Sequence, residues 1–317
     1  MYNIKHALFS FSLALAVLIA SVPAAFAQNS VAAYSVIDAT TGHVLSARDD
    51  DKKLQIGSLT KIATAMVVLD WAEASHKDLA QYATVPAQAS AIGGANPVLQ
   101  PGDRATVRDL LYAALMQSDD TAALTLEYYV GQSLPRTAEM TPEIAFVNQM
   151  NALARHLKME HTLFLNAHGL DNVQGTLPYS TSGDLARLAS YAMARSAFRF
   201  YVSQKEREIV IQRLDNTQSR YMLRNTNELL GVNSIDGVKT GATRRAGECV
   251  IISAARPPES VQNGETYTIT PRRLIIVVLG STNRFNVAAG LLTQGWQLYD
   301  QWAAKGRPLK KNEALVL

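Results

Sequence analysis

The chain has 317 residues, of which 48% are hydrophobic and 18% charged, and its formal net charge is +3. This composition is typical of a globular protein with a sizeable core, in one large domain or two ordinary ones. The nearly neutral balance excludes a polybasic surface for nucleic acid or membranes, so we expect no nucleic-acid partner. A single cysteine, Cys249, excludes an internal disulfide.

The first 27 residues are typical of a secretory signal peptide. Lys5 and His6 give a positive start, residues 7–22 carry no charge, and Ala25-Phe26-Ala27 provides a small-x-small cleavage pattern. An uncleaved membrane anchor is the alternative, although the apolar run is short for a span. We therefore predict an exported protein, periplasmic or extracellular, with no stable membrane anchor after cleavage.

The sequence gives little sign of thiol or metal chemistry. Cys249 lies in the apolar run 249–252, where a buried, inert thiol is favoured over a catalytic one. The six histidines are scattered without zinc-ligand spacing, so we expect no metal and no cofactor.

The N-terminal part predicts a β-hairpin followed by a buried helix. Residues 31–38 and 43–47 are rich in β-formers and flank a turn. A helix is predicted to begin near Ser58, since apolar residues recur at helical spacing and the opposite face is also fairly apolar. After an irregular stretch over 75–105, Thr106 caps a second helix with Asp109 as its partner. The apolar stripe of that helix, extended by one step, places Ser118 facing a core or a cleft.

The rest of the chain predicts more helices and then strands. Helices are expected over 121–129, over 142–157 with Thr141 as cap, and over 183–195 with Ser182 as cap. Strands over 248–254 and 274–279 are joined by a polar loop with a possible turn at Asn263-Gly264. A last amphipathic helix spans 285–302.

These elements predict a mixed α/β (α+β) fold. Strands from both chain ends form one antiparallel sheet, and a helical subdomain over roughly residues 65–225 is inserted between them. Residues 28–317 then form a single domain.

Ser58 and Lys61 have the spacing of a nucleophile and its base. Three residues apart at a helix start, they share one face. A serine hydroxyl needs a neighbouring base, and a desolvated lysine can serve as one. The helix N-terminus supplies amide groups and positive potential for an acyl oxyanion. Alone, this pair is a weak motif.

Two further motifs strengthen the pair. Lys239-Thr240-Gly241 precedes the first C-terminal strand, where it is either a polar turn or a carboxylate-binding strand edge with close backbone approach at the glycine. Ser118-Asp119-Asp120 is either a second site motif or merely a helix end and the next cap. Taken in order, the three motifs match the set found in class A β-lactamases and penicillin-binding proteins.

From about Ala32 to Trp302 the chain resembles the serine-type D-alanyl-D-alanine carboxypeptidases, the low-molecular-mass penicillin-binding proteins of peptidase family S11. The resemblance rests on five stretches, which are residues 56–61, 110–118, 166–171, 225–230 and 236–243. It implies a DD-peptidase/β-lactamase-like fold, peptidoglycan stem peptides as substrates and β-lactams as covalent inhibitors.

The resemblance also implies a role for each motif residue. Ser58 would attack the carbonyl between two D-alanines, Lys61 would accept its proton, and Ser118 would relay a proton to the leaving amine. Lys239 and Thr240 would hold the terminal carboxylate, and the amides of Ser58 and Ala242 would form the oxyanion hole. The stretch 236–243 also places Gly241, Ala242 and Thr243 in the substrate-binding set, and we include Asp120 there because it stands at the last position of the second motif.

The chain departs from the family at three places. Asp120 stands where the family has asparagine, and a carboxylate can only accept hydrogen bonds and favours the charged form of Lys61. Residues 256–271 form a longer hairpin excursion than the family usually has, either a substrate-facing flap or a solvated loop. We expect no C-terminal β-domain, because little chain follows Trp302.

Three alternative functions stay open. A D,D-endopeptidase would use the same residues. A class A β-lactamase needs a deacylating glutamate, for which Glu160 is a superficial match followed by Phe164 where asparagine is expected. A non-catalytic peptidoglycan-binding homologue could have lost activity through Asp120.

Overall fold

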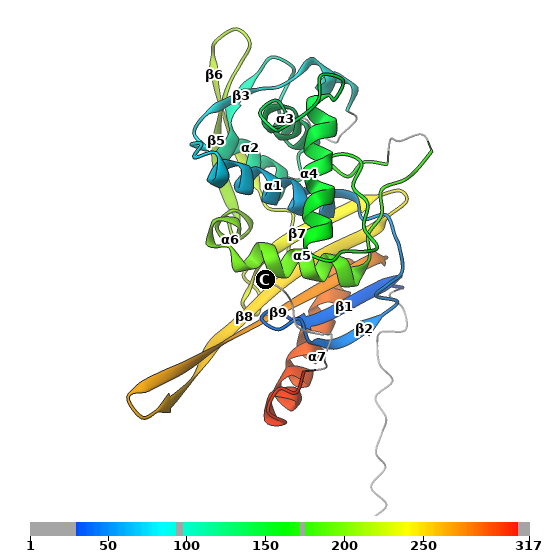
Figure 1. Cartoon of the computed structure of the whole chain (residues 1–317), viewed down its shortest axis with the longest axis vertical. Helices are drawn as coiled ribbons and strands as arrows, with labels where there is room; N and C mark the ends of the chain where they lie inside the picture. The colour runs from blue at the N-terminus through cyan, green and yellow to red at the C-terminus, as the bar shows by residue number, and fades with distance from the viewer. Residues whose placement is uncertain (1–29, 93–97, 172–174, 310–317) are drawn as a thin grey trace, which may run out of the picture.

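In the computed structural model of the chain, which describes residues 30–92, 98–171 and 175–309, strands from the two ends of the chain form one sheet (Figure 1). Its order is β2-β1-β9-β8-β7, and every neighbouring pair is antiparallel. The strands are β1 (Ala33–Asp38), β2 (Val44–Arg48), β7 (Ile235–Thr243), β8 (Gly247–Asn263) and β9 (Thr266–Ser281). The predicted antiparallel sheet is confirmed.

Both faces of this sheet are covered, because its central strands are apolar on both sides. Helix α7 (Arg284–Ala304) packs on one face, where Val250 and Val278 join the aromatic side chain of Trp296. Helix α5 (Ser182–Ala194) packs on the other face, which buries the alternate residues Ile251 and Val277. The runs predicted as strands are therefore buried from two sides.

Several of the remaining helical elements pack around α1, which is buried on nearly all sides as predicted. A short turn, η2 (Gly57–Thr60), leads into α1 (Lys61–Ala74). The other helical elements are η3 (Ala87–Ala91), α2 (Val107–Tyr112), η4 (Ala113–Gln117), α3 (Asp120–Gly131), α4 (Pro142–His156) and α6 (Ser196–Val202). Chain segments on several sides thus meet the first turn of α1.

The inserted part also contains a second sheet that the sequence did not predict. Its order is β3-β4-β5-β6. The strands are β3 (Tyr82–Thr84), β4 (Arg104–Thr106), β5 (Glu206–Gln212) and β6 (Gln218–Arg224). β3 and β4 are short, and β5 and β6 expose many charged side chains, so neither pair has a distinct hydrophobic pattern.

Two of the three predicted helix caps are confirmed, and the third is wrong by one residue. Thr106 and Thr141 accept hydrogen bonds from backbone amides of the first turns of α2 and α4. At α5 the cap is Thr181, whose Oγ1 accepts from the Asp184 amide at 3.1 Å. Ser182 instead receives a hydrogen bond from Ser35 on β1 at 2.9 Å, because its side chain faces the sheet.

The segment 256–271 is a hairpin excursion, as predicted, but it is formed by paired strands and is not a loop. β8 and β9 continue as an antiparallel ribbon from Glu259 paired with Thr270 to Asn263 paired with Thr266, and the chain reverses at Gly264 and Glu265. Figure 1 shows this ribbon extending from the sheet away from α1, α3 and α4. The alternation of β-branched residues with polar ones is itself a strand pattern, so the predicted polar loop is corrected to a ribbon.

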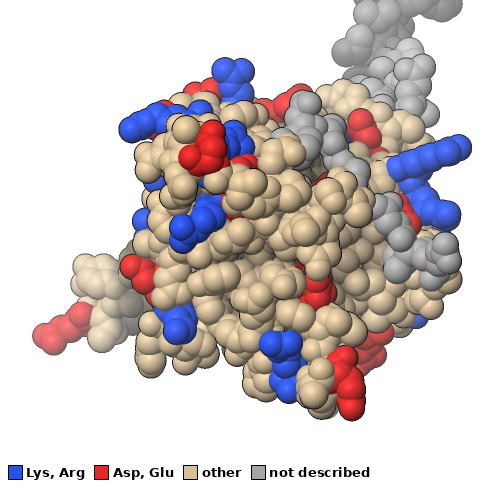
Figure 2. All heavy atoms as spheres, turned by 90° about the horizontal axis from the view of Figure 1, so that it is seen from above, with Lys and Arg blue, Asp and Glu red and all other residues tan. Residues whose placement is uncertain are grey.

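Surface and thiol chemistry agree with the sequence. On the face shown in Figure 2, basic and acidic side chains are interspersed. Cys249 is fully buried on β8, and burial raises the pKa of its thiol to about 11, so the inert thiol is confirmed.

Among the helices of the described residues, none has the length and apolarity needed to cross a membrane. The predicted signal peptide lies outside the described residues.

Candidate active site

Ser58 and Lys61 lie where η2 becomes α1. The Ser58 Oγ is 2.8 Å from the Lys61 Nζ. Gly57, with φ of +52°, sets the tight entry into this turn, a backbone conformation that favours glycine. Ser58 is half-buried, whereas Lys61 is fully buried. The predicted pairing of the hydroxyl and the amine on one face is present.

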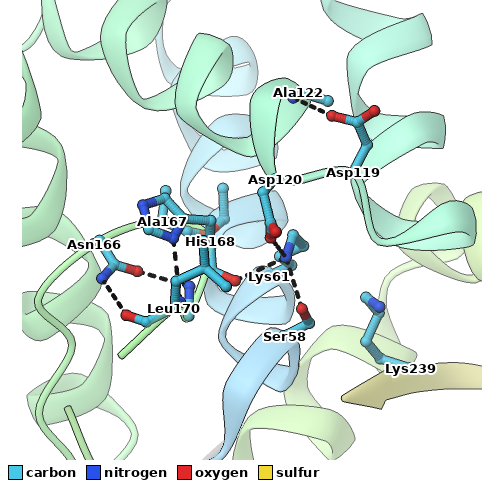
Figure 3. Close-up of polar contacts among 12 residues, drawn as sticks. Ser58, Lys61, Asp119, Asp120, Ala122, Asn166, Ala167, His168, Leu170 and Lys239 are labelled. Carbon is cyan, nitrogen blue, oxygen red and sulfur yellow. Dashed lines mark hydrogen bonds and ion pairs between the residues drawn. The ribbon is translucent and has the colours of Figure 1, made fainter. Parts of the chain in front are cut away.

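Lys61 has a hydrogen-bond partner for each proton of its ammonium group (Figure 3). Besides Ser58, its Nζ donates to Asp120 Oδ1 at 2.6 Å and to the His168 carbonyl oxygen at 2.7 Å. Burial lowers the pKa of Lys61, and the neighbouring Asp120 carboxylate offsets part of that effect. Asp120 thus acts on Lys61 in the predicted direction, but burial dominates.

Asp119 and Asp120 begin helix α3. The Asp119 side chain is the helix cap and accepts from the Ala122 amide at 2.7 Å. Asp120 is the first helical residue and points toward Lys61 (Figure 3). The interpretation of this motif as a helix cap therefore holds, and the same segment also places Asp120 against Lys61.

The position of Ser118 is set by a local backbone conformation that the sequence pattern did not predict. The helix widens into the π-turn η4 over Ala113–Gln117, so the 3.6-residue stripe does not continue to Ser118. Ser118 itself has a left-handed backbone with φ of +65° and is half-buried. Its hydroxyl is not one of the three partners of Lys61.

Lys239, Thr240 and Gly241 lie on β7, at the edge of the sheet, and not in a turn. Lys239 is 1% exposed, and its Nζ donates to the Thr240 carbonyl oxygen at 2.9 Å. Burial, with the added repulsion of Lys61, lowers the pKa of Lys239 well below its usual value. Lys239 is therefore a desolvated amine in a region of positive potential.

Two glycines let β7 approach η2 closely. A Cβ atom at Gly241 would stand 3.0 Å from the Ile56 carbonyl oxygen and 3.3 Å from the Ser58 amide nitrogen. A Cβ atom at Gly57 would stand 3.5 Å from the Ala242 amide nitrogen. The backbone amides of Ser58 and Ala242 thus belong to two segments in direct contact, the arrangement that an oxyanion hole requires.

Side chains that the sequence analysis did not assign connect β7 to the rest of the site. The Thr226 Oγ1 is 2.6 Å from the Thr240 Oγ1 and also donates to the Met116 carbonyl of η4 at 3.2 Å. At the other end of the motif, Thr243 donates to Asp171 Oδ2 at 2.6 Å. Thr226 and Asp171 both lie in stretches that carry the family resemblance, which was the available signal for them.

Arg284 also contacts this strand. Its guanidinium donates to the Gly241 carbonyl oxygen at 3.0 Å. Its positive charge adds to the lowering of the Lys239 pKa. The sequence analysis gave no signal for this contact, because Arg284 is an isolated charge at the start of α7.

The segment 166–170 forms another wall of the site (Figure 3). Asn166 Oδ1 accepts from the Gly169 amide at 2.6 Å, and the Leu170 amide donates to His168 Nδ1 at 3.1 Å. Gly169, with φ of +86°, lies so close to Gly57 that a Cβ would meet the Gly57 carbonyl oxygen at 2.0 Å. Burial lowers the pKa of His168 to about 4, so its ring is neutral and its contribution to Lys61 is the backbone carbonyl.

Two other predictions concern groups outside this cluster. Glu160, the candidate deacylating residue of a β-lactamase, is exposed in the turn after α4 and is not a partner of Lys61. Within residues 30–92, 98–171 and 175–309, no group of three or more histidine, cysteine or acidic side chains is placed to hold a metal ion.

Comparison with known proteins identifies the family. The sequence profile of peptidase S11, D-alanyl-D-alanine carboxypeptidase, matches residues 20–282. The chain belongs to the peptidase S11 family. The D-alanyl-D-alanine carboxypeptidase DacC of Escherichia coli is 32% identical over 279 residues, which are 84% of this chain and 62% of that relative. The chain thus spans less than two thirds of that relative.

Two further similar proteins differ in their named activities. The D-alanyl-D-alanine endopeptidase of Pseudomonas aeruginosa is 32% identical over 222 residues, which cover 68% of this chain and 64% of that protein. The crystal structure of the Streptomyces K15 DD-transpeptidase has a TM-score of 0.71 and 28% identity, covering 84% of this chain and 98% of that one. The predicted family and DD-peptidase-like fold are both confirmed.

Proposed function

We propose that this protein is a serine D-alanyl-D-alanine carboxypeptidase that removes the terminal D-alanine of peptidoglycan stem peptides. The observation that carries this proposal is the 2.8 Å contact between the Ser58 hydroxyl and the buried Lys61 amine, on a turn packed against the Lys239-Thr240-Gly241 strand. A nucleophile, a desolvated base and a cationic strand edge are what this hydrolysis requires.

Acylation begins with transfer of the Ser58 proton to Lys61. Burial favours the neutral amine of Lys61, which accepts the proton as the Ser58 Oγ attacks the carbonyl of the penultimate D-alanine. The amides of Ser58 and Ala242 stabilise the oxyanion. Ser118 relays a proton to the leaving amine, free D-alanine departs, and the acyl group stays on Ser58 until water releases it.

The substrate carboxylate binds at β7. Lys239 supplies the charge, while Thr240, oriented by Thr226, supplies a hydroxyl. Gly241 permits the close backbone approach, and Thr243, held by Asp171, closes the end of the strand. A carboxylate brought to Lys239 would offset the repulsion that it now receives from Lys61 and so favours its ammonium form.

In this proposal Asp120 changes the properties of the active site but does not abolish its activity. One of its oxygens accepts from Lys61, so the other can only accept from a substrate donor. The enzyme therefore remains active, with a pH profile or substrate preference set in part by this carboxylate. β-Lactams, as substrate mimics, acylate the same Ser58.

A D,D-endopeptidase is the second candidate, because the Pseudomonas aeruginosa relative carries that name and the same residues would act. The two activities differ in the leaving group, which is free D-alanine in one case and a cross-linked peptide in the other. Whichever is correct, we propose export to the cell envelope, based on the N-terminal segment, with residues 28–317 acting as one catalytic unit.

The deciding experiment gives the purified protein a stem pentapeptide ending in D-Ala-D-Ala and, separately, a cross-linked dimer. We expect free D-alanine from the first and little monomer from the second. Monomer from the dimer alone would establish the endopeptidase. Fluorescent penicillin should label the wild type and not a Ser58→Ala variant, and absence of that labelling would leave a non-catalytic peptidoglycan-binding protein.

A further inference from the structure

Thr226 connects two parts of the site that the proposed mechanism uses separately. Its Oγ1 donates to the Met116 carbonyl oxygen at 3.2 Å, and its backbone N–H donates to the same oxygen at 3.0 Å. The Thr226 Oγ1 is also 2.6 Å from the Thr240 Oγ1 on β7. Met116 is fully buried in η4, two residues before Ser118. One side chain thus joins the strand that would bind the substrate carboxylate to the turn that leads to Ser118.

The two hydroxyl groups fix the direction of this chain of hydrogen bonds. A threonine hydroxyl has one proton and two lone pairs, whereas a carbonyl oxygen can only accept. Because Thr226 donates its proton to Met116, the contact between the two hydroxyl groups is a hydrogen bond from Thr240 to Thr226. Without substrate, the proton of the Thr240 hydroxyl is therefore directed at Thr226. The Met116 carbonyl oxygen accepts from both the N–H and the O–H of Thr226.

A substrate carboxylate at β7 would reverse this direction. A carboxylate can only accept, so Thr240 must turn its proton away from Thr226 to bind it. The Thr240 oxygen then accepts from Thr226 across the same contact. Thr226 has no second hydroxyl proton for Met116, whose carbonyl keeps only the backbone N–H of Thr226. Carboxylate binding thus removes one of the two hydrogen bonds that Thr226 makes to η4.

The turn that loses this hydrogen bond sets the position of Ser118. Ser118 has a left-handed backbone with φ of +65°, a conformation that a serine keeps only under restraint by its surroundings. The residue between Met116 and Ser118 is also held, since Gln117 Nε2 donates to the Tyr221 hydroxyl at 3.0 Å. The Ser118 hydroxyl is not a partner of Lys61 in the absence of substrate. A change at the Met116 carbonyl therefore reaches Ser118 through a short, restrained peptide segment.

We propose that Thr226 is a positioning residue that makes the placement of Ser118 depend on a bound substrate carboxylate. The inference rests on the proposed function, in which Thr240 binds that carboxylate and Ser118 relays a proton to the leaving amine. Without a carboxylate, the Thr226 hydroxyl holds Met116. With a carboxylate, this hold is released and Ser118 adjusts toward Lys61 and the leaving nitrogen. Proton relay is thus favoured for substrates with a free terminal carboxylate, the class that a carboxypeptidase must select.

The test compares fluorescent penicillin, which has a carboxylate, with its methyl ester, which has none. The limiting rate of acylation and the half-saturating concentration are measured for both compounds, together with the melting temperature of each variant. Thr226→Val keeps the shape of the side chain and removes its hydroxyl, whereas Thr226→Ser keeps the hydroxyl. Should the valine variant not fold, Thr226→Ala removes the same hydroxyl with less bulk. The matched control is Tyr221→Phe, which removes the hydrogen bond to Gln117 in the same turn and leaves the hydroxyl chain of Thr226 intact.

For the wild type we expect the limiting acylation rate with penicillin to exceed that with the ester by about tenfold, a usual effect of one hydrogen bond. In Thr226→Val the Met116 carbonyl lacks the hydroxyl with either compound, so the two limiting rates should agree within about twofold. Thr226→Ser should keep the wild-type ratio. Tyr221→Phe should keep it too, even where both rates fall. The half-saturating concentration should stay higher for the ester in every variant, because Lys239 still attracts the carboxylate.

Three results would overturn the inference. The first is a Thr226→Val variant with lower rates but the wild-type ratio, which shows a purely structural role. The second is convergence of the half-saturating concentrations in that variant, which assigns Thr226 to binding alone. The third is a wild type with equal limiting rates for penicillin and its ester. Failure of the proposed function looks different, because neither compound would then acylate the wild type, and the inference would fail with it.

Discussion

Two lysines of this site are buried to the same extent but have opposite surroundings. Lys61 is 0% exposed and Lys239 is 1% exposed, and burial lowers the pKa of both. Lys61 has the Asp120 carboxylate at 2.6 Å, whereas the Nζ of Lys239 donates to a neutral carbonyl, that of Thr240. The positive charges of Lys61 and Arg284 also lower the Lys239 pKa, and the Asp120 carboxylate offsets part of that effect.

The difference suits the two lysines to the different roles proposed for them. Lys61 has a fixed counter-ion, so its protonation is set by the protein before a substrate arrives. Lys239 lies near the positive charges of Lys61 and Arg284, which disfavour its own charge. A bound anionic group would offset this repulsion and favour the ammonium form of Lys239. In the proposed mechanism burial keeps Lys61 available as a base although Asp120 favours its charged form, and Lys239 becomes charged as it receives the carboxylate.

The largest expected effect is that of removing the amine of Lys61. Lys61→Met keeps most of the apolar stem and leaves Ser58 without its base, so acylation by fluorescent penicillin should fall by about 10³-fold or more. The same change at the exposed Lys53 serves as the control. Acylation that survives within tenfold would remove Lys61 from the role of base.

A smaller effect is expected from Lys239, and it should depend on the substrate. Lys239→Gln removes the charge that binds the peptide carboxylate, so KM for a D-Ala-D-Ala peptide should rise by about 10- to 100-fold, the usual effect of losing a charged hydrogen-bond partner. The same peptide with an amidated terminus should be affected much less. Equal losses on both peptides would contradict carboxylate binding by Lys239.

The smallest effect is a shift of the pH profile by Asp120→Asn. The Asp120 carboxylate raises the pKa of Lys61 against the effect of burial, so its removal lowers that pKa further. The acidic limb of the acylation rate should then move to lower pH, by about one unit. Asp119→Asn, which keeps a capping side chain, should cause a smaller shift because Asp119 acts more weakly on Lys61. Superimposable profiles, with unchanged substrate preference, would show that Asp120 has no such role.

Local signals predicted much of the fold. The caps at Thr106 and Thr141 were predictable because a capping hydroxyl and the amide it binds are close in sequence. The runs over 248–254 and 274–279 became central strands because their apolar side chains can be buried on both faces. The β5–β6 hairpin was missed because its side chains are largely exposed, so burial left little pattern in the sequence.

For the site, the sequence by itself determined the pairing of Ser58 with Lys61, because three-residue spacing at a helix start places both side chains on one face. Only the tertiary structure decided the surroundings of Lys61. The Lys61 contacts with Asp120 and the His168 carbonyl, and the Thr226 contact with Met116, join segments far apart in the chain. Such contacts depend on packing between elements, which leaves no periodic pattern in either segment.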